Sequence, residues 1–117
     1  MHNFKNLKVW QKSVDLAVKI YQVTSDFPVS EKFGITSQMR RASVSIPSNI
    51  TEGTAKSSSK SFANSLEISL GESFELETQM IIAERVSLIS SDITQEMASD
   101  ISEIQRMIVG FKSTLTT

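Results

Sequence analysis

Helical periodicity runs through almost the whole chain, and this feature limits most strongly what the sequence can fold into. Apolar residues recur every three or four positions in four segments, and no segment shows the sustained alternation that is typical of strands. Only two prolines and four glycines interrupt the 117 residues. The pattern predicts four helices, which span residues 7–24, 35–55, 59–87 and 92–114.

The connections between these segments are short and contain turn and capping residues. Pro28 favours an extended backbone at the preceding residue, Gly53 suits a helix end, and Asp92 fits an N-cap of the last helix. Short connections favour antiparallel neighbouring helices, and a chain of this length fits one domain. We therefore expect a single all-α domain over residues 1–117, an antiparallel up-down-up-down four-helix bundle.

Pro47 lies inside the second predicted helix. A proline there removes one backbone hydrogen bond and clashes with the carbonyl four residues earlier, here that of Ser43. The apolar spacing nevertheless continues from Ile35 through Pro47 to Gly53. The spacing predicts one continuous second helix that bends at Pro47, with a hydroxyl of Ser43 or Ser45 helping to satisfy the freed carbonyl.

The first predicted helix carries more apolar surface than one core requires. On a helical wheel its apolar residues cover about 220°, whereas a helix that faces one core needs an apolar stripe of roughly 100° or somewhat more. The surplus predicts a homo-oligomer, although a monomer with some exposed apolar surface is the alternative. The predicted oligomer interface consists of Val9, Leu16, Ile20 and Val23.

A polar row follows the second predicted helix beside its apolar stripe. Its members are Gln38, Arg41, Ser45, Asn49 and Glu52. Such a row is a binding site, a polar seam between helices, or a solvated edge, and the residue types alone leave all three open. If the second and third helices turn near residue 57, Arg41 faces Glu75 and Ser45 faces Gly71. We therefore predict that Arg41 pairs with Glu75, a carboxylate set among apolar neighbours, and that Gly71 allows close helix approach.

Charge is divided unevenly along the chain, although the net charge is only −1. Residues 1–60 carry nine basic and four acidic side chains, a net charge of +5. Residues 61–117 carry three basic and nine acidic side chains, a net charge of −6. We expect the two halves to attract each other, within one chain or between copies.

Nucleic acid is a candidate partner because basic residues gather on the first helix. The candidate contact residues are Lys5, Lys8, Lys12, Lys19 and Arg40. Repeated by symmetry, they would form a phosphate-binding ring. The alternative is an ordinary solvated helix face, which Asp15 and the acidic second half favour. An overall basic balance would be more typical of a nucleic-acid binder.

Several chemistries lack the residues that they need. The chain has no cysteine, which removes disulfides, zinc–thiolate sites and thiol nucleophiles. The single histidine is His2, so neither a serine–histidine pair nor the Glu-x-x-His motif of di-iron bundles is expected. We predict a non-enzymatic protein with no catalytic residue, cofactor or metal. The sequence also lacks a membrane-spanning apolar stretch and a signal peptide at its start, so we expect a cytoplasmic protein.

Three stretches carry a family resemblance: FKNLKVWQKSVDLAVKIY, DFPVSEKFGITSQMRRASVSIPSNITEG and GESFELETQ. They resemble the bacterial four-helix bundle proteins encoded in intervening sequences of large-subunit ribosomal RNA genes, which are related to accessory proteins of diversity-generating retroelements. Glu72 departs from the family pattern, in which a serine usually follows the glycine, and Lys56 stands where arginine is common. The matching positions are Pro28, Gln38, Arg41, Pro47, Asn49, Glu52, Gly53, Gly71, Glu75 and Thr78.

The resemblance implies an up-down-up-down bundle and a ring of five subunits. The resemblance implies no catalytic residue in this chain. The retroelement branch resembles a strongly basic nucleic-acid-binding barrel, which fits this slightly acidic chain poorly. Together with the residue patterns, the resemblance predicts an oligomeric scaffold or interaction protein. The alternative is an RNA- or DNA-binding accessory protein that uses the basic face of the first helix and Arg40.

Overall fold

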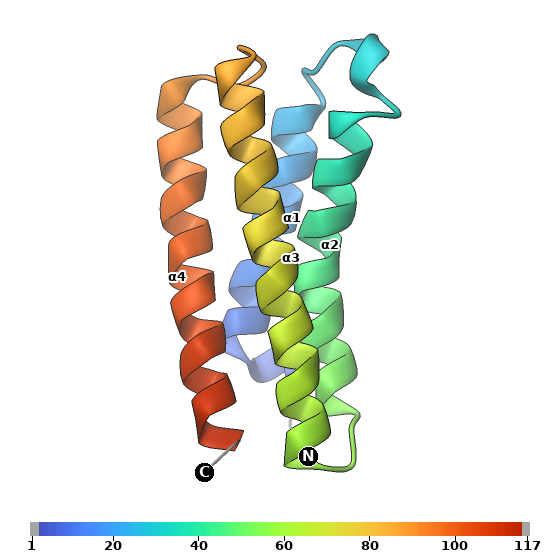
Figure 1. Cartoon of the computed structure of the whole chain (residues 1–117), viewed down its shortest axis with the longest axis vertical. Helices are drawn as coiled ribbons and strands as arrows, with labels where there is room; N and C mark the ends of the chain where they lie inside the picture. The colour runs from blue at the N-terminus through green and yellow to red at the C-terminus, as the bar shows by residue number, and fades with distance from the viewer. Residues whose placement is uncertain (1–2, 116–117) are drawn as a thin grey trace.

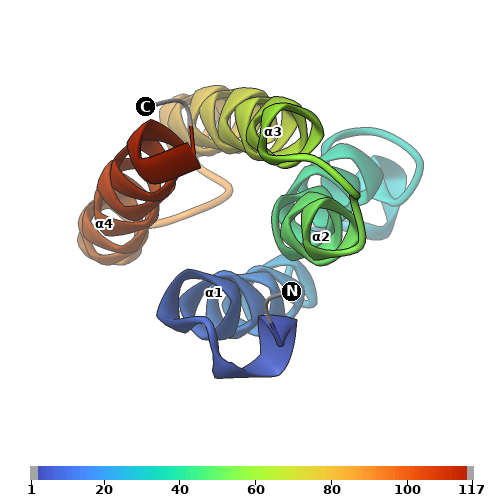
Figure 2. The same cartoon turned by 90° about the horizontal axis from the view of Figure 1, so that it is seen from below.

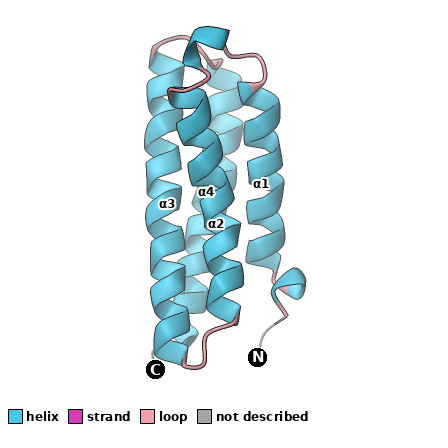
Figure 3. Cartoon of the chain, turned by 90° about the vertical axis from the view of Figure 1, so that its right-hand side faces the viewer, coloured by secondary structure: helices cyan, strands magenta, loops and turns pink. Residues whose placement is uncertain are grey.

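Four α-helices make up most of the structure, a computed structural model that describes residues 3–115. They are α1 (Lys8–Thr24), α2 (Ile35–Thr54), α3 (Ser59–Arg85) and α4 (Ser91–Leu115). Two short 3-10 helices accompany them, η1 (Phe4–Asn6) before α1 and η2 (Val29–Glu31) in the connection between α1 and α2. The described residues contain no strand (Figure 3). The predicted all-α four-helix fold is confirmed.

The helices lie side by side in a bundle 44 Å long and 24 by 20 Å across. The α1–α2 and α3–α4 connections lie at one end, and the α2–α3 connection lies at the other (Figure 1). Viewed along the bundle, the helices follow one another around a ring in chain order (Figure 2). The α1–α2 pair and the α3–α4 pair therefore form opposite sides of the bundle.

Serine hydroxyl groups cap the N-termini of the last two helices. The Ser58 hydroxyl accepts a hydrogen bond from the Ser61 N–H at 3.1 Å at the start of α3. The Ser90 hydroxyl accepts one from the Ile93 N–H at 3.2 Å at the start of α4. The prediction of Asp92 as the N-cap is wrong, because Ser90 takes that role and Asp92 lies in the first turn of α4. Ser87, with a φ of 65°, follows the end of α3 in the left-handed region.

The core is filled from all four helices, and it contains residues that we predicted at an oligomer interface. Val9, Leu16 and Ile20 are buried within the chain, and Val23 is half-buried against the same core. The predicted interface is therefore wrong for the first three. The broad apolar arc of α1 meets both α2 and α4 (Figure 2), so one chain covers most of it. The part of the arc left exposed contains Val18 and Tyr21.

The helix runs through Pro47 without interruption, as predicted, whereas the bend there stays a prediction. The Ser43 hydroxyl donates to the Arg40 carbonyl at 2.9 Å, so it does not serve its own carbonyl. A hydroxyl from the neighbouring helix contacts a different carbonyl, the one that directly precedes the proline. Ser69 of α3 is fully buried and donates to the Ile46 carbonyl at 2.9 Å. This hydrogen bond ties α3 to the part of α2 that the proline disturbs.

The close approach of α2 and α3 occurs at Gly53, not at Gly71. A Cβ added at Gly53 would lie 2.6 Å from the Phe62 ring and 3.0 Å from the Ser65 Cβ. A Cβ added at Gly71 would meet nothing within 4 Å, because Gly71 lies exposed on the outer face of α3. The predicted packing role of Gly71 within the chain is therefore wrong.

The two glycines give a matched pair of variants. Gly53→Ala should lower the free energy of unfolding by up to about 2 kcal/mol. Overpacking a core costs roughly 1–3 kcal/mol, and the gain in helix propensity offsets up to about 1 kcal/mol. Gly71→Ala should raise the free energy of unfolding by about 0.5–1 kcal/mol, because only the propensity changes. Urea denaturation measures both, and equal effects of the same sign would contradict the assignment.

Candidate functional site: a polar seam between α2 and α3

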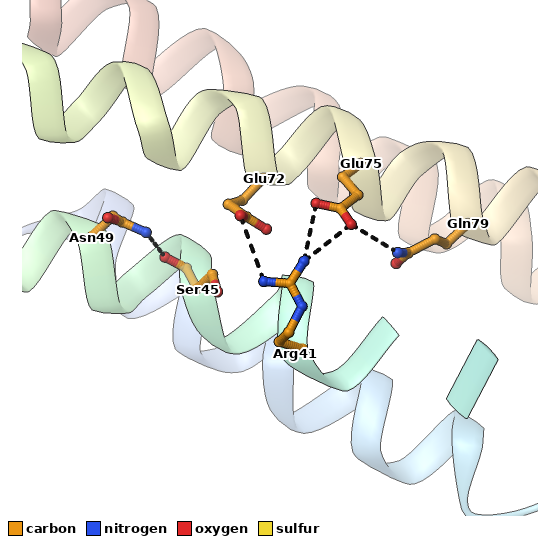
Figure 4. Close-up of polar contacts among 6 residues, drawn as sticks. All are labelled: Arg41, Ser45, Asn49, Glu72, Glu75 and Gln79. Carbon is orange, nitrogen blue, oxygen red and sulfur yellow. Dashed lines mark hydrogen bonds and ion pairs between the residues drawn. The ribbon is translucent and has the colours of Figure 1, made fainter. Parts of the chain in front are cut away.

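A row of polar side chains joins α2 to α3 on the outside of the bundle (Figure 4). The Arg41 guanidinium of α2 donates to both carboxylate oxygens of Glu75, at 3.1 and 3.3 Å. It also lies 3.9 Å from a carboxylate oxygen of Glu72. The Gln79 amide donates to Glu75 at 3.4 Å and extends the row by one turn of α3. The predicted pairing of Arg41 with Glu75 is confirmed.

The Arg41–Glu75 pair is open to solvent, which differs from the buried carboxylate that we expected. The Arg41 side chain is 60% exposed and the Glu75 side chain is 43% exposed. Exposed ion pairs contribute at most about 1 kcal/mol, because water screens the charges and two long side chains must be ordered. Arg41 and Glu75 therefore place α2 and α3 relative to each other and add little to stability.

Glu72 is the more buried acid of the seam. Its side chain is 19% exposed, and its Oε2 has no hydrogen-bond partner within residues 3–115. Burial raises the pKa of the Glu72 carboxyl, the negative charge of Glu75 raises it further, and the Arg41 guanidinium partly opposes both. Sequence reasoning had marked Glu72 only as a departure from the family pattern. The signal that could have found it is its position one helical turn from Glu75, facing Arg41.

The other members of the predicted row do not join the seam as one site. The Asn49 amide donates to the Ser45 carbonyl at 2.8 Å, one turn earlier in the same helix (Figure 4). Gln38 and Glu52 lie exposed at the two ends of the row. The row therefore divides into three parts. Arg41 joins α2 to α3, Asn49 makes a contact within α2, and the two ends of the row are exposed to solvent.

Two of the candidate nucleic-acid lysines make ion pairs with acids of α4. The Lys12 ammonium lies 2.9 Å from Glu103, and the Lys19 ammonium lies 2.7 Å from Glu96 and 2.8 Å from Asp100. These contacts raise the pKa of both lysines, mainly through hydrogen bonds to the carboxylates. The expected attraction between the basic and acidic halves is confirmed within one chain.

The remaining candidate cations are placed differently. Lys5 and Lys8 lie exposed near the start of α1. The Arg40 Nε donates to the Thr24 hydroxyl at 2.9 Å, and its guanidinium lies 4.5 Å from the centre of the Tyr21 ring. Arg40 is thus tied to the far end of α1. The structure does not gather the five cations into one surface.

Two apolar grooves remain on the outside of the bundle. The α1/α2 groove, of about 500 Å³, is lined mainly by Val14, Val18, Tyr21, Val44 and Pro47. The α3/α4 groove, of about 390 Å³, is lined mainly by Leu70, Phe74, Gln105, Val109 and Gly110. Val18, Tyr21, Val44, Phe74 and Val109 are each about half exposed. The two grooves lie on opposite sides of the bundle, because each belongs to one of the opposite helix pairs in Figure 2.

Within residues 3–115, no three histidine, cysteine, aspartate or glutamate side chains come together as metal ligands would. No helix in that part of the chain combines the length and the hydropathy needed to cross a bilayer. His2 lies outside the described residues.

Two comparisons with known proteins found similarities. The family model described as 23S rRNA-intervening sequence protein matches residues 5–110. A crystal structure from Bacteroides thetaiotaomicron, described as a protein with unknown function from the S23 ribosomal protein family, has a similar fold with a TM-score of 0.83. The two sequences are 27% identical over 90% of this chain and 95% of that chain. No curated protein matches the chain.

The raised pKa of Glu72 predicts how stability changes with pH. The folded protein holds the Glu72 proton more tightly than the unfolded chain does. Its contribution to stability is therefore complete below the ordinary value of 4.5 and is lost as pH rises through the raised pKa. Glu72→Gln removes this loss, so the variant should gain stability relative to the unaltered protein as the pH rises from 4.5 through the raised pKa of Glu72.

Urea denaturation at several pH values measures the change. Glu52→Gln removes one negative charge at an exposed position and is the matched control. A stability difference between Glu72→Gln and the unaltered protein that does not vary with pH would contradict the assignment.

Proposed function

Because the chain belongs to the 23S rRNA-intervening sequence protein family, we propose that it is a non-enzymatic scaffold or interaction protein that works as a homo-oligomeric ring. Five subunits is the number that the family resemblance implies. The observation that carries the proposal is the pair of apolar grooves on opposite sides of one bundle.

The position of the two grooves bears on the symmetry of the assembly. A two-fold dimer joins the same surface of both copies, and it would leave one groove of each chain uncovered. When the α1/α2 groove of one copy meets the α3/α4 groove of the next, every copy uses both surfaces. Such head-to-tail contacts close into a ring when the rotation between neighbours permits it. A cyclic assembly therefore covers both grooves, whereas a dimer does not.

The polar seam supports a structural role in this assembly. Arg41 neutralises the carboxylates that it contacts on α3. The exposed apolar residues Ile68 and Ile82 lie on the same outer face of α3 as Glu75. An interface that contained this face would use Arg41 and Glu75 for orientation and the isoleucines for burial.

The assembly predicts a mass of about five times 13.0 kDa by light scattering, unchanged by added salt. Val18→Asp in the α1/α2 groove and Phe74→Asp in the α3/α4 groove should each reduce the mass to that of small species. Val29→Asp is the matched control, because Val29 is exposed in the α1–α2 connection and lines neither groove.

Mixing the two groove variants tests the head-to-tail arrangement. Each variant keeps one intact groove, so an equimolar mixture should form heterodimers, whereas each variant alone should not. A two-fold contact would give no such complementation. An unaltered protein that runs as a single chain at high micromolar concentration would overturn the scaffold proposal.

The second candidate is an RNA- or DNA-binding accessory protein, and the exposed Lys5 and Lys8 support it. If it is right, binding falls steeply with added salt, because phosphate contacts release counterions. Lys5→Gln with Lys8→Gln should weaken binding more than Lys12→Gln with Lys19→Gln, because α4 carboxylates already hold Lys12 and Lys19. A gel-shift titration at two salt concentrations measures both effects. Binding that changes neither with salt nor between the variants would contradict this candidate.

A further inference from the structure

A basic and aromatic hollow lies beside the start of α2, at the end of the bundle that holds the α1–α2 connection (Figure 1). Its volume is about 400 Å³, and its walls include Tyr21, Phe33, Lys32, Arg40 and Arg41. No acidic side chain lines it. Arg41 already makes ion pairs with Glu72 and Glu75. In the described part of the chain, Lys32 and Arg40 make no ion pair. The hollow therefore favours an anionic ligand.

The two rings in this wall offer flat apolar surfaces. Phe33 is 89% exposed, which is costly for a phenyl ring unless something covers it. The Lys32 ammonium lies 5.5 Å from the centre of the Phe33 ring. On the α1 side, the Arg40 guanidinium lies 4.5 Å from the centre of the Tyr21 ring. Each ring thus stands next to a cation, an arrangement that suits a ligand with both an aromatic group and a negative charge.

The first turn of α2 opens at the same place without a cap. Gly34 precedes the helix and has no side chain to accept from the free N–H groups, and the first turn contains no acidic residue. Glu31, whose carboxylate would lie 3.2 Å from a Cβ at Gly34, does not line the hollow. An uncapped N-terminus of a 20-residue helix attracts anions through its N–H groups and its dipole.

Thr36 gives an independent indication of a ligand. Its side chain is 8% exposed, yet its hydroxyl has no hydrogen-bond partner within residues 3–115. A buried hydroxyl without a partner is costly. Thr36 lines the basic and aromatic hollow, and it also lines an adjoining hollow of about 220 Å³ that Lys32 and Arg40 share. A ligand atom that reached this wall would satisfy the hydroxyl.

We propose that this hollow binds a nucleoside phosphate. The phosphate lies at the start of α2, between Lys32 and Arg40, and accepts from the first N–H groups of the helix and from the Thr36 and Ser37 hydroxyls. The base stacks on Phe33 or Tyr21. The same chemistry is offered by a free mononucleotide and by one nucleotide of a single strand. The site belongs to one chain and does not rest on the ring.

Calorimetric titration with adenosine monophosphate, adenosine, inorganic phosphate and an adenylate decamer tests the site. Adenosine monophosphate should bind more tightly than adenosine or phosphate alone, because each of these has half of the recognised chemistry. A decamer that binds more tightly than the mononucleotide identifies a strand as the source, and equal affinities identify the free nucleotide.

Three variants locate the binding. Phe33→Ala should weaken binding of adenosine monophosphate about tenfold, since stacking of one base on an aromatic ring contributes an effect of this order. Lys32→Gln should weaken binding and reduce its dependence on salt. Thr36→Val should weaken binding and raise the thermal stability of the unliganded protein, because it removes the unpartnered hydroxyl.

Two exposed residues outside the hollow give matched controls. Val86→Ala changes an exposed apolar residue that follows the end of α3, and Lys60→Gln removes a charge at the opposite end of the bundle. Both should bind as the unaltered protein does. Failure of both adenosine monophosphate and the decamer to bind at millimolar concentration would overturn the proposal. So would equal affinity in Phe33→Ala, Lys32→Gln and the two controls.

Discussion

The close contact between α2 and α3 is the constraint on which the rest of the bundle depends. It is made possible by small side chains, with Gly53 against the Phe62 ring and the buried Ser69 against the Ile46 carbonyl. Because α2 and α3 lie this close, Arg41 on one helix reaches Glu75 on the other. The Ser69 hydroxyl also donates to the Ile46 carbonyl, which directly precedes Pro47, whereas the hydrogen bond that the proline removes is the one to the Ser43 carbonyl. One contact thus links the unusual backbone of α2 to the polar seam.

Ion pairs between α1 and α4 stabilise the side of the bundle opposite to the α2–α3 contact. The basic face of α1 meets the acidic face of α4 through Lys12 and Lys19, so charges that would otherwise mark a binding surface act within the chain. This pairing alters the functional interpretation of the first helix. A row of lysines attracts phosphate when it is unpaired, and it attracts it far less when carboxylates lie within 3 Å. The neutralised α1–α4 side also leaves the apolar grooves as the surfaces that most need covering.

The two proposals concern different parts of the molecule and would coexist. The grooves run along the α1–α2 and α3–α4 sides, whereas the basic and aromatic hollow lies at the end that holds the α1–α2 connection. Tyr21 belongs to both the α1/α2 groove and the hollow. A copy seated in the groove would therefore contact a residue of the nucleoside phosphate site, and assembly and binding would affect each other through this ring.

Local pattern was enough to predict the four helices and the Arg41–Glu75 pair, because helical period and hairpin register depend on spacing along the chain. Three features needed the tertiary structure. A helical wheel gives relative angles and not the direction of the core, so Val9, Leu16 and Ile20 were assigned outward although they are buried. Interhelical distance, which no spacing encodes, decides that Gly53 rather than Gly71 marks the close approach. The packing of α1 against α2 brings Tyr21 to the same hollow as Phe33 and Thr36, and spacing along the chain does not predict this.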